Sequence, residues 1–384
     1  MTIILDLRPL LGGKTSGVEV YTHQLIKNIL ELDKKNTYIL FANAYAKQNI
    51  FSQFSEYSNV VTVQTRIPNK IFNFALAIFK RPKIDRLILN YLKKRTDIKI
   101  EKIDVFLMPD LRPSQVSSHV KKICVIHDLS FHHFPQFFSW KTRLWYKILQ
   151  AKREISSSDA IIAVSNFTKS DLEKSFQVSA QKIKVVHEAV DDDFCNEVTD
   201  QISLKVQKKY SLPQKYFLFL ATLEPRKNML RLIDAFQIYK KNNPNDPIQL
   251  VLAGQKNEKI FSTIKLKRVP DVHIPGFIDE TDKATVMKNA EAFLYPSLFE
   301  GFGLPLLEAM KCSTPIITSN TSSMPEVCGN AALFINPENK DEIAAAMEEI
   351  RKPEVRSSLK KEMLEQIKKF SWKKCAQETL DIII

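Results

Sequence analysis

Glycine is scarce in this chain, which has only 8 Gly in 384 residues, whereas average usage is about 7%. A single glycine often does no more than close a tight turn. Nearly all of these, however, follow a predicted strand, in loops that could face one cleft, so the set predicts backbone that approaches a ligand closely. The eight are Gly12, Gly13, Gly17, Gly254, Gly276, Gly301, Gly303 and Gly329.

Cysteine is also sparse, and the chain lacks long apolar runs. The five cysteines are odd in number and scattered, with no Cys-x-x-Cys pair, so neither a disulfide framework nor a zinc cluster is indicated. This usage fits a reducing cytoplasm. The first residues lack the charged start and apolar core of a signal peptide, and no window approaches the roughly 20 apolar residues of a membrane span. We therefore expect a cytoplasmic protein.

Acidic residues are rare between residues 66 and 100, where ten Lys or Arg stand against Asp85 and Asp97 within a chain of net charge +13. Apolar residues lie among these cations at helical spacing. Such a segment can lie on anionic lipid, or it can be an ordinary amphipathic helix that covers the domain core; both readings stay open. A second aromatic and basic run, 137–153, is predicted to pack inside. The charge would also permit nucleic-acid binding, but no reading motif accompanies it, so we expect no nucleic-acid partner.

Apolar runs alternate with helical patterns along almost the whole chain, which predicts α/β architecture with parallel sheets wrapped by helices. A polar, acidic interval from 188 to about 200 separates two such series. We therefore expect two Rossmann-like, doubly wound domains facing a cleft, at 1–200 and 201–369. Ligands of such sheets bind beyond the carboxyl ends of the strands. The expected strands are 3–7, 38–41, 105–108, 123–126, 160–164 and 183–186, then 216–221, 249–253, 272–274, 292–295 and 315–318.

The most informative segment reads Glu-Gly-Phe-Gly-Leu-Pro-Leu-Leu-Glu and covers residues 300–308. An apolar run precedes it, and Pro305 suits the first helical position, so the segment joins a strand to a helix. Backbone amides at such a helix start carry partial positive charge, and Gly301 and Gly303 let that backbone approach a ligand. The segment therefore predicts a site for an anion such as a diphosphate.

Two adjacent cations lie in another expected strand-to-helix loop. Arg226 and Lys227 belong to the sequence Thr-Leu-Glu-Pro-Arg-Lys-Asn at residues 222–228. An Arg-Lys pair is most often solvated surface. In this loop the two side chains together can neutralise a diphosphate leaving group: the Arg226 guanidinium through paired hydrogen bonds, and the Lys227 ammonium as a compact charge.

These motifs together resemble the retaining, nucleotide-sugar-dependent glycosyltransferases of family four, which have the two-domain GT-B architecture. The resemblance spans nearly the whole chain. It is carried by Glu-Pro-Arg-Lys-Asn at 224–228, Leu-Ala-Gly at 252–254, Pro-Gly-Phe-Ile at 275–278, the fifteen residues 296–310 and Pro-Glu-Val-Cys-Gly at 325–329, and in the first half by Asp-Leu-Arg at 6–8, His-Asp-Leu at 127–129 and Val-Ser-Asn-Phe at 164–167. Phe-Ser-Trp at 370–372 resembles the family's terminal helix, so the resemblance implies a helix at 370–384 that returns to the first domain.

The resemblance implies a role for each matching residue. Arg226 and Lys227 would hold the donor diphosphate, Glu308 the ribose, and Glu300 and His127 the transferred sugar. The remaining donor-binding positions that it implies are the first-domain loop at Gly13 and Gly17, Gly254, the backbone of Phe277 and Ile278 beside the nucleobase, and the loop residues Gly301, Phe302, Gly303 and Leu304. The family often has glycine where this chain has Ala189 and Ala221, so the fit of the donor near Ala221 could differ.

Three other interpretations of these residues are weaker. Glu300 and Glu308 could be mistaken for the two carboxylates of a retaining glycosidase, but a diphosphate leaving group needs charge stabilisation more than a proton. The run Asp191, Asp192 and Asp193 contains an Asp-x-Asp pattern, yet a solvated turn or helix cap explains it, and we expect no metal cofactor. Two further histidines, 132 and 133, lack the spacing of a metal pair and are read as structural.

The sequence therefore predicts a metal-independent hexosyltransferase that moves a sugar from a nucleotide-diphosphate donor to a glycan or lipid-linked acceptor in cell-surface polysaccharide synthesis. The resemblance to bacterial mannosyltransferases favours GDP-mannose as the donor. A nucleotide-sugar epimerase or hydrolase on the same fold is the alternative enzyme. The basic stretch 66–100 allows peripheral association with the inner face of the plasma membrane.

Overall fold

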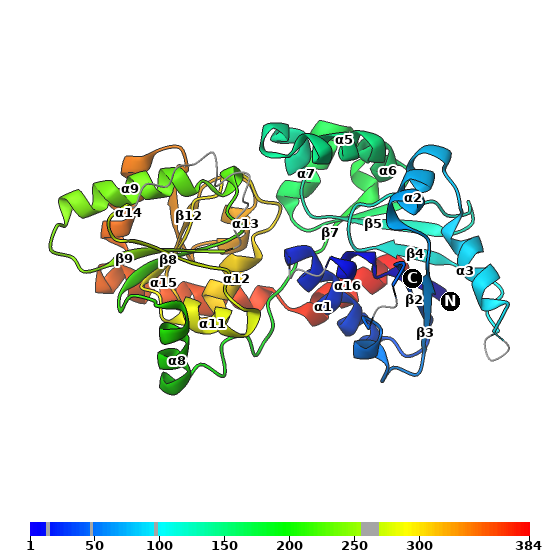
Figure 1. The fold of residues 1–384 in the computed structure, drawn as a ribbon, viewed down its shortest axis with the longest axis horizontal. Helices are drawn as coiled ribbons and strands as arrows, with labels where there is room; N and C mark the ends of the chain where they lie inside the picture. Colours follow the sequence, from blue (N-terminus) through cyan, green and yellow to red (C-terminus); the bar gives the residue numbers. More distant parts are fainter. Residues whose placement is uncertain (13–15, 47–48, 96–98, 255–268) are drawn as a thin grey trace. The chain divides into compact units, whose positions relative to one another are not determined.

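The computed structural model describes residues 1–384 except 13–15, 47–48, 96–98 and 255–268. The chain forms two compact units (Figure 1). The first unit comprises Met1–Glu188 and Trp372–Ile384, and the second unit comprises Ala189–Ser371. The sequence placed the domain boundaries after residues 200 and 369, whereas the two units divide after Glu188 and after Ser371.

The first unit is built on a parallel sheet with the strand order β3-β2-β1-β4-β5-β6-β7 within the described residues. Strand β1 pairs on both sides, with Leu5 opposite Leu40 of β2 and opposite Leu107 of β4. Strands buried on both faces read as continuous apolar runs, which is why most of them could be predicted. The strands are β1 Thr2–Asp6, β2 Thr37–Asn43, β3 Val60–Thr65, β4 Val105–Met108, β5 Lys121–Ile126, β6 Ala160–Ala163 and β7 Ile183–Val185.

Helices of the first unit cover this sheet (Figure 1). The first of them, α1, begins after Ser16, whose side chain accepts from the Glu19 amide while the Glu19 carboxylate accepts from the Ser16 amide. The terminal helix α16 packs against α1, and Lys121 Nζ donates to the Ile382 carbonyl at 2.6 Å. The helices are α1 Gly17–Leu32, α2 Asn69–Phe74, the π-helix η3 Ala75–Phe79, α3 Ile84–Leu92, α4 Ser130–His133, α5 Trp140–Leu149, α6 Ala151–Ser156, α7 Asn166–Phe176 and α16 Trp372–Ile383.

The second unit repeats this build with a parallel sheet in the order β10-β9-β8-β11-β12-β13 within the described residues. Its strands are β8 Tyr216–Leu220, β9 Gln249–Ala253, β10 Val272–Gly276, β11 Ala292–Tyr295, β12 Ile316–Ser319 and β13 Leu333–Ile335. Its helices are α8 Asp200–Tyr210, α9 Met229–Asn242, α11 Glu280–Lys288, α12 Leu304–Lys311, α13 Met324–Cys328, α14 Lys340–Glu349 and α15 Pro353–Gln366. The predicted α/β class, with two doubly wound parallel sheets, is confirmed.

Three details differ from the sequence predictions. Strands β3 and β13 were not predicted. The run 137–153 was predicted to be interior, but the side chain of Trp140 is 63% exposed and that of Leu144 47% exposed. A disulfide was not expected either, yet Cys195 and Cys312 are joined, with their Cα atoms 5.4 Å apart. The two cysteines are 117 residues apart, so their spacing carries no sign of the pairing.

Candidate functional site

The strand order of the second unit reverses between β8 and β11, because the chain moves outward from β8 in one direction and from β11 in the other. Open parallel sheets bind ligands at this switch point, beyond the carboxyl ends of the strands. The loop after β8 carries Arg226 and Lys227, and the loop after β11 carries Glu300. The topology therefore brings the three predicted residues to one place.

The loop after β8 is held rigidly. A short 3-10 helix, Pro225–Lys227, ends at Asn228 in the left-handed conformation, with φ 63°. The side-chain amide of Asn228 donates to the carbonyls of Pro296 at 3.1 Å and Pro337 at 2.6 Å. These bonds fix the loop against its neighbours, so that Arg226 and Lys227 are positioned before any ligand arrives.

Arg226, Lys227 and Glu300 form one buried charge cluster. The Glu300 carboxylate accepts from Lys227 Nζ at 2.6 Å and from Arg226 Nη1 at 3.0 Å. Lys227 Nζ also donates to the Tyr295 hydroxyl at 2.9 Å. The second side of the guanidinium is engaged as well, since Arg226 Nη2 lies 2.8 Å from a carboxylate oxygen of Glu224. Two cations thus share the carboxylate of Glu300.

Electrostatics keep Glu300 ionised. Burial by itself would raise the pKa of this carboxyl, but the charges of Arg226 and Lys227 outweigh burial and hold the pKa at about 2, compared with 4.5 for a free glutamate. Only 6% of Glu300 is exposed. The residue is therefore a permanent anion that balances the two cations while no diphosphate is bound.

The loop after β11 leads directly into helix α12. Gly303 precedes the helix with φ 102°, a conformation that favours glycine, and Leu304 is its first residue, so Pro305 stands second rather than first. Among the described residues, no acceptor is found for the amides of Gly303 and Leu304. Gly301 is buried in this loop, and the Phe302 side chain packs edge-on against Phe370, with ring centroids 5.8 Å apart. Two amides at the helix start are thus available for an anion.

Glu308 lies farther along α12 and carries an incomplete hydrogen-bond set. Its Oε1 accepts from Lys283 Nζ at 2.5 Å, whereas its Oε2 is buried and has no hydrogen-bond partner among the described residues. Burial raises the pKa of this carboxyl, and Lys283 opposes the rise. A buried acceptor without a donor is costly, so the geometry fits a ligand hydroxyl that donates to Oε2.

The remaining predicted donor positions of the second unit lie at the ends of β9 and β10. Gly254 has φ 142°, and a Cβ atom there would lie 1.8 Å from the carbonyl oxygen of Ala221, so this glycine is required by close packing of two strand ends. Gly276 has φ 89° with open space beside it. Phe277 follows it with 53% exposure, while Ile278 is 5% exposed. Of the two residues that follow β10, Phe277 is thus accessible to a ligand and the side chain of Ile278 is not.

His127 in the first unit lies just after β5, among the other strand ends of its sheet. Its Nδ1 is 2.8 Å from the Glu188 carboxylate, and its Nε2 is 2.9 Å from the Pro109 carbonyl. Burial alone would lower the pKa of the imidazole, but Glu188 and the nearby Asp110 raise it to about 9. His127 is therefore a cation whose two N–H groups are both donated within the protein.

A cavity of about 470 Å³ adjoins His127. Its lining combines charged and aromatic side chains, a composition suited to a sugar, which offers both hydroxyls and apolar ring faces. The lining includes Asn73, Asp110, Arg112, His127, Trp145 and Tyr146. Of the two loop glycines predicted to approach the phosphates, Gly17 is the first residue of α1 and Gly13 lies outside the described residues.

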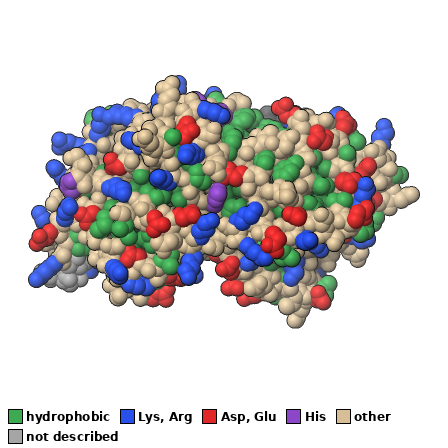
Figure 2. All heavy atoms as spheres, turned by 180° about the vertical axis from the view of Figure 1, so that it is seen from behind, with side chains coloured by type: hydrophobic (Ala, Val, Ile, Leu, Met, Phe, Trp, Pro, Cys, Tyr) green, Lys and Arg blue, Asp and Glu red, His purple; other side chains and the backbone are tan. Residues whose placement is uncertain are grey.

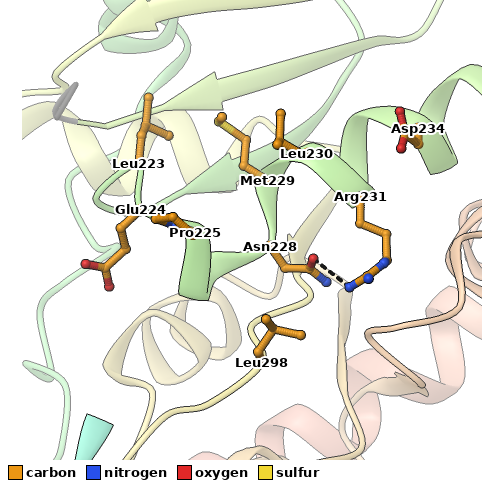
Figure 3. A pocket seen from close by; sticks show the side chains of 9 residues that line it. All are labelled: Leu223, Glu224, Pro225, Asn228, Met229, Leu230, Arg231, Asp234 and Leu298. Atoms are coloured by element: carbon orange, nitrogen blue, oxygen red, sulfur yellow. Dashed lines mark hydrogen bonds between the residues drawn. The ribbon is translucent and has the colours of Figure 1, made fainter. Parts of the chain in front are cut away.

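A second cavity, of about 350 Å³, lies on the flank of the loop after β8 (Figure 3). Arg231 turns toward Asn228, and their side chains are hydrogen bonded at 3.1 Å. The charge cluster does not line this cavity. It adjoins the cluster through Glu224, which binds Arg226.

Three supporting residues were not found from the sequence. Glu188 holds His127, Lys283 holds Glu308, and Tyr295 accepts from Lys227. Glu188 and Lys283 belong to no recognisable motif, and their partners are 61 and 25 residues distant. Tyr295 was assigned only to a buried strand, and nothing in that apolar run marked its hydroxyl.

Comparison with known proteins decides the family. A sequence profile described as "Glycosyl transferases group 1" matches residues 200–370, and one described as "Glycosyltransferase Family 4" matches residues 15–194. The chain is 30% identical to O-antigen chain mannosyltransferase B of Escherichia coli over 267 residues, which are 68% of this chain and 69% of that protein. The chain is a glycosyltransferase of this family.

This glycosyltransferase is also similar to a longer mannosyltransferase and to a protein of known structure. It is 29% identical to the serotype-specific mannosyltransferase WbdA of Escherichia coli over 68% of its own length, but this match spans only 33% of that longer protein. Its fold matches the structure of Anabaena HepE in complex with UDP and glucose, with a TM-score of 0.67, 15% identity and coverage of 100% and 99% of the two chains. The expected GT-B fold is thereby confirmed.

Proposed function

We propose that this glycosyltransferase moves a mannosyl residue from GDP-mannose to a glycan or lipid-linked acceptor during cell-surface polysaccharide synthesis, with retention of anomeric configuration. The likeness to two mannosyltransferases supports the choice of sugar. The observation that carries the proposal is the buried cluster in which Arg226 and Lys227 share the carboxylate of Glu300 at the switch point of the second sheet.

The donor diphosphate would take over the two cations. Its oxygens compete with Glu300 for Arg226 and Lys227, and the amides of Gly303 and Leu304 add donors at the start of α12. Once its cations are shared with the diphosphate, the Glu300 carboxylate can accept hydroxyl hydrogen bonds from the transferred sugar. The same residue would thus serve first as counter-ion and then as sugar contact.

Transfer itself needs no covalent enzyme intermediate in this proposal. The bond between the sugar C1 and the diphosphate oxygen breaks, and a bond from C1 to the acceptor oxygen forms on the same face. The acceptor proton passes to the departing phosphate oxygen, while Arg226 and Lys227 stabilise the negative charge that develops there. We propose that the reaction requires no metal ion, because these two cations and the helix start supply the charge.

Three other features complete the donor and acceptor sites. Oε2 of Glu308, which has no hydrogen-bond partner among the described residues, would accept a ribose hydroxyl, and the backbone of Phe277 and Ile278 would lie beside the base. The cavity next to His127 would hold the acceptor glycan. The His127 imidazolium would act there as a fixed positive charge rather than as a base, because both of its N–H groups are already donated.

Thermal-shift screening of GDP-, UDP-, ADP- and TDP-sugars against the purified protein tests the donor. We expect GDP-mannose to raise the melting temperature most, and Arg226→Ala and Glu308→Ala to weaken its binding at least tenfold, since each removes a charged or buried hydrogen bond of about 1.5–3 kcal/mol. Lys352→Ala is the matched control, because it removes one partner of an exposed ion pair, that of Lys352 with Glu349. Unchanged donor affinity in both site variants would refute the assignment.

Product analysis separates the remaining alternatives. NMR of the glycan product should show the anomeric configuration of the donor, and a chelator should leave the rate unchanged. Turnover of the donor at the full rate without any acceptor would instead identify a hydrolase or epimerase.

We further propose that the enzyme works in the cytoplasm, at the inner face of the plasma membrane. No helix in the described parts of the chain is both long and apolar enough to cross a bilayer.

A further inference from the structure

The net charge of the protein resides entirely in the first unit. That unit contains 31 Lys and Arg and 18 Asp and Glu, so its net charge is +13, whereas the second unit contains 25 of each. In Figure 2, Lys and Arg side chains are spread over the half of the molecule that holds the first unit, together with hydrophobic ones. Net charge keeps a protein soluble wherever on the protein it lies, so solubility does not explain why all of it lies in the first unit. The positive charge of that unit therefore needs another explanation.

Within the first unit, two segments hold most of this excess. Residues 66–84 contain five Lys or Arg and no acidic residue, and residues 137–153 contain five more and again none. Among the described residues, none of these ten cations forms an ion pair. The positive charge of both segments is therefore uncompensated.

The same two segments expose large apolar side chains. Ile71 and Phe79 of α2 and η3 are 63% and 66% exposed, and Phe74 and Ile78 beside them also face solvent. Trp140 and Leu144 of α5 are exposed as well, and α5 packs against η3, so the two segments form one surface. We call it the α2–η3–α5 surface. Its exposed residues are Ile71, Phe74, Ile78, Phe79, Trp140 and Leu144, with the cations Lys70, Lys80, Arg81, Lys141, Arg143 and Lys147.

The exposure of these side chains distinguishes between the two interpretations of the basic stretch 66–100, a membrane-binding surface and an ordinary amphipathic helix. Helix α3 is an ordinary amphipathic helix, because its apolar residues Ile84, Ile88 and Leu92 are buried in the core. In α2 and η3, by contrast, Phe72 and Leu76 fill the core while other apolar residues point outward. An ordinary covering helix would present polar side chains there. Large exposed apolar groups within a rim of cations are what an interfacial helix presents to a membrane.

We propose that the α2–η3–α5 surface docks the protein on a bilayer of anionic phospholipid. The aromatic and aliphatic side chains would enter the boundary between headgroups and acyl chains, and the surrounding cations would bind the phosphate groups. A second copy of this chain is the poorer occupant, because a symmetric contact would oppose one set of unpaired cations with an identical set.

The docking surface adjoins the cavity at His127. Asn73 of α2 and Trp145 and Tyr146 of α5 line that cavity, so the two helices that would touch lipid also form part of its wall. A glycan on a lipid carrier could therefore reach the cavity while its carrier stays in the bilayer. This step rests on the proposed glycosyl transfer, whereas docking itself does not.

Vesicle flotation of the full-length protein tests the docking. We expect binding to vesicles that contain phosphatidylglycerol and little binding to phosphatidylcholine alone. Reversing two cations, in Lys80→Glu/Arg143→Glu, should weaken binding by roughly thirtyfold or more, since each basic residue near an anionic surface contributes about 1 kcal/mol. Removing two apolar groups, in Phe79→Ser/Trp140→Ser, should release the protein at high salt, where screening has already weakened the charges.

Matched changes on α8 of the second unit provide the control. Ile202→Ser/Leu204→Ser and Lys205→Glu/Lys208→Glu likewise alter exposed apolar and basic residues and should leave flotation unchanged. All variants should keep the wild-type affinity for the donor nucleotide, which shows that they fold and separates this test from that of the transferase. Flotation that ignores anionic lipid, equal effects of the α8 changes, or a shift from dimer to monomer in the α2–η3–α5 variants would overturn the proposal.

Discussion

Replacement of Glu300 by glutamine should destabilise the second unit and make its stability depend on bound diphosphate. The substitution keeps the size of the side chain and removes its charge. Arg226 and Lys227, 3.0 and 2.6 Å from the carboxylate, then lie buried beside a neutral amide whose NH₂ group repels their donors. Both cations remain, whereas the carboxylate that they share is lost, and of the two only Arg226 is paired with a second carboxylate among the described residues, that of Glu224.

Two independent arguments give the same magnitude for this loss. The pKa of Glu300 falls from 4.5 to about 2 on folding, which corresponds to roughly 3 kcal/mol of stability at neutral pH. Breaking a buried ion pair by removing one partner costs about 3–5 kcal/mol. The depressed pKa also fixes the pH window: the stabilisation is present above about pH 4.5 and is lost as the pH falls through about 2. We therefore expect Glu300→Gln to lower the free energy of unfolding of the second unit by about 3 kcal/mol at pH 7.

The assay must report on the second unit alone. All three tryptophans, at positions 140, 145 and 372, belong to the first unit, so their fluorescence follows that unit only. Hydrogen exchange of amides in β8 and β11, with increasing urea, reports on the second unit. Glu291→Gln is the control, because its pair with Arg356 is 2.7 Å long but 28% and 25% exposed, and such pairs contribute at most about 1 kcal/mol.

Rescue by ligand distinguishes this reasoning from a simple packing defect. A nucleoside diphosphate brings the negative charge that the variant lacks, so it should protect Glu300→Gln more than wild type against exchange. The reasoning is refuted if Glu300→Gln and Glu291→Gln lose the same stability, or if the diphosphate protects wild type and variant equally.

Three further outcomes are expected. In Glu188→Gln, the pKa of His127, followed by NMR, should fall from about 9 toward 6.5. In the wild-type protein, the pair of the imidazolium with Glu188 stabilises the fold fully below about pH 6.5, and this stabilisation is lost as the pH rises through 9. The variant should therefore be less stable than wild type at neutral pH. Gly254→Ala should fail to yield soluble protein because its Cβ would meet a carbonyl oxygen at 1.8 Å, whereas Gly276→Ala, with open space, should cost only about 1–2 kcal/mol. Cys195→Ser should lower the urea midpoint of the oxidised protein, and reducing agent should abolish the difference, since closing a loop of more than 100 residues is worth up to about 5 kcal/mol.

The architecture could be predicted from the sequence because parallel strands covered on both faces are continuously apolar. Strand β3 was not predicted because it is an edge strand with a single neighbour, and its sequence Val-Val-Thr-Val-Gln-Thr contains polar residues among the apolar ones. Strand β13 has only three residues, but β7 is equally short and was predicted, so length alone does not explain why β13 was missed. Trp140 was misplaced for another reason: helical spacing reveals an apolar face but not whether protein or solvent covers it.

The charge cluster of the site was only half predictable. Loops that follow β8 and β11 must meet once the strand order is known, so the proximity of Arg226 and Glu300 follows from topology. That Glu300 is already bound by both cations does not follow, because the family resemblance assigns it to the sugar. Likewise, the sequence does not show that Lys283 donates to Oε1 of Glu308, or that Oε2 has no partner within the described part of the chain.

The division of charge between the units suggests a division of labour in recognition. The second unit has no net charge, so it exerts little long-range attraction on a nucleotide, and its recognition must rest on the short contacts of Arg226, Lys227 and the helix start. Buried charges are screened little by salt, whereas charges on an exposed surface are screened strongly. Salt should therefore release the protein from anionic lipid at concentrations that leave donor affinity nearly intact, which would make membrane attachment, and not donor binding, the step that responds to ionic conditions.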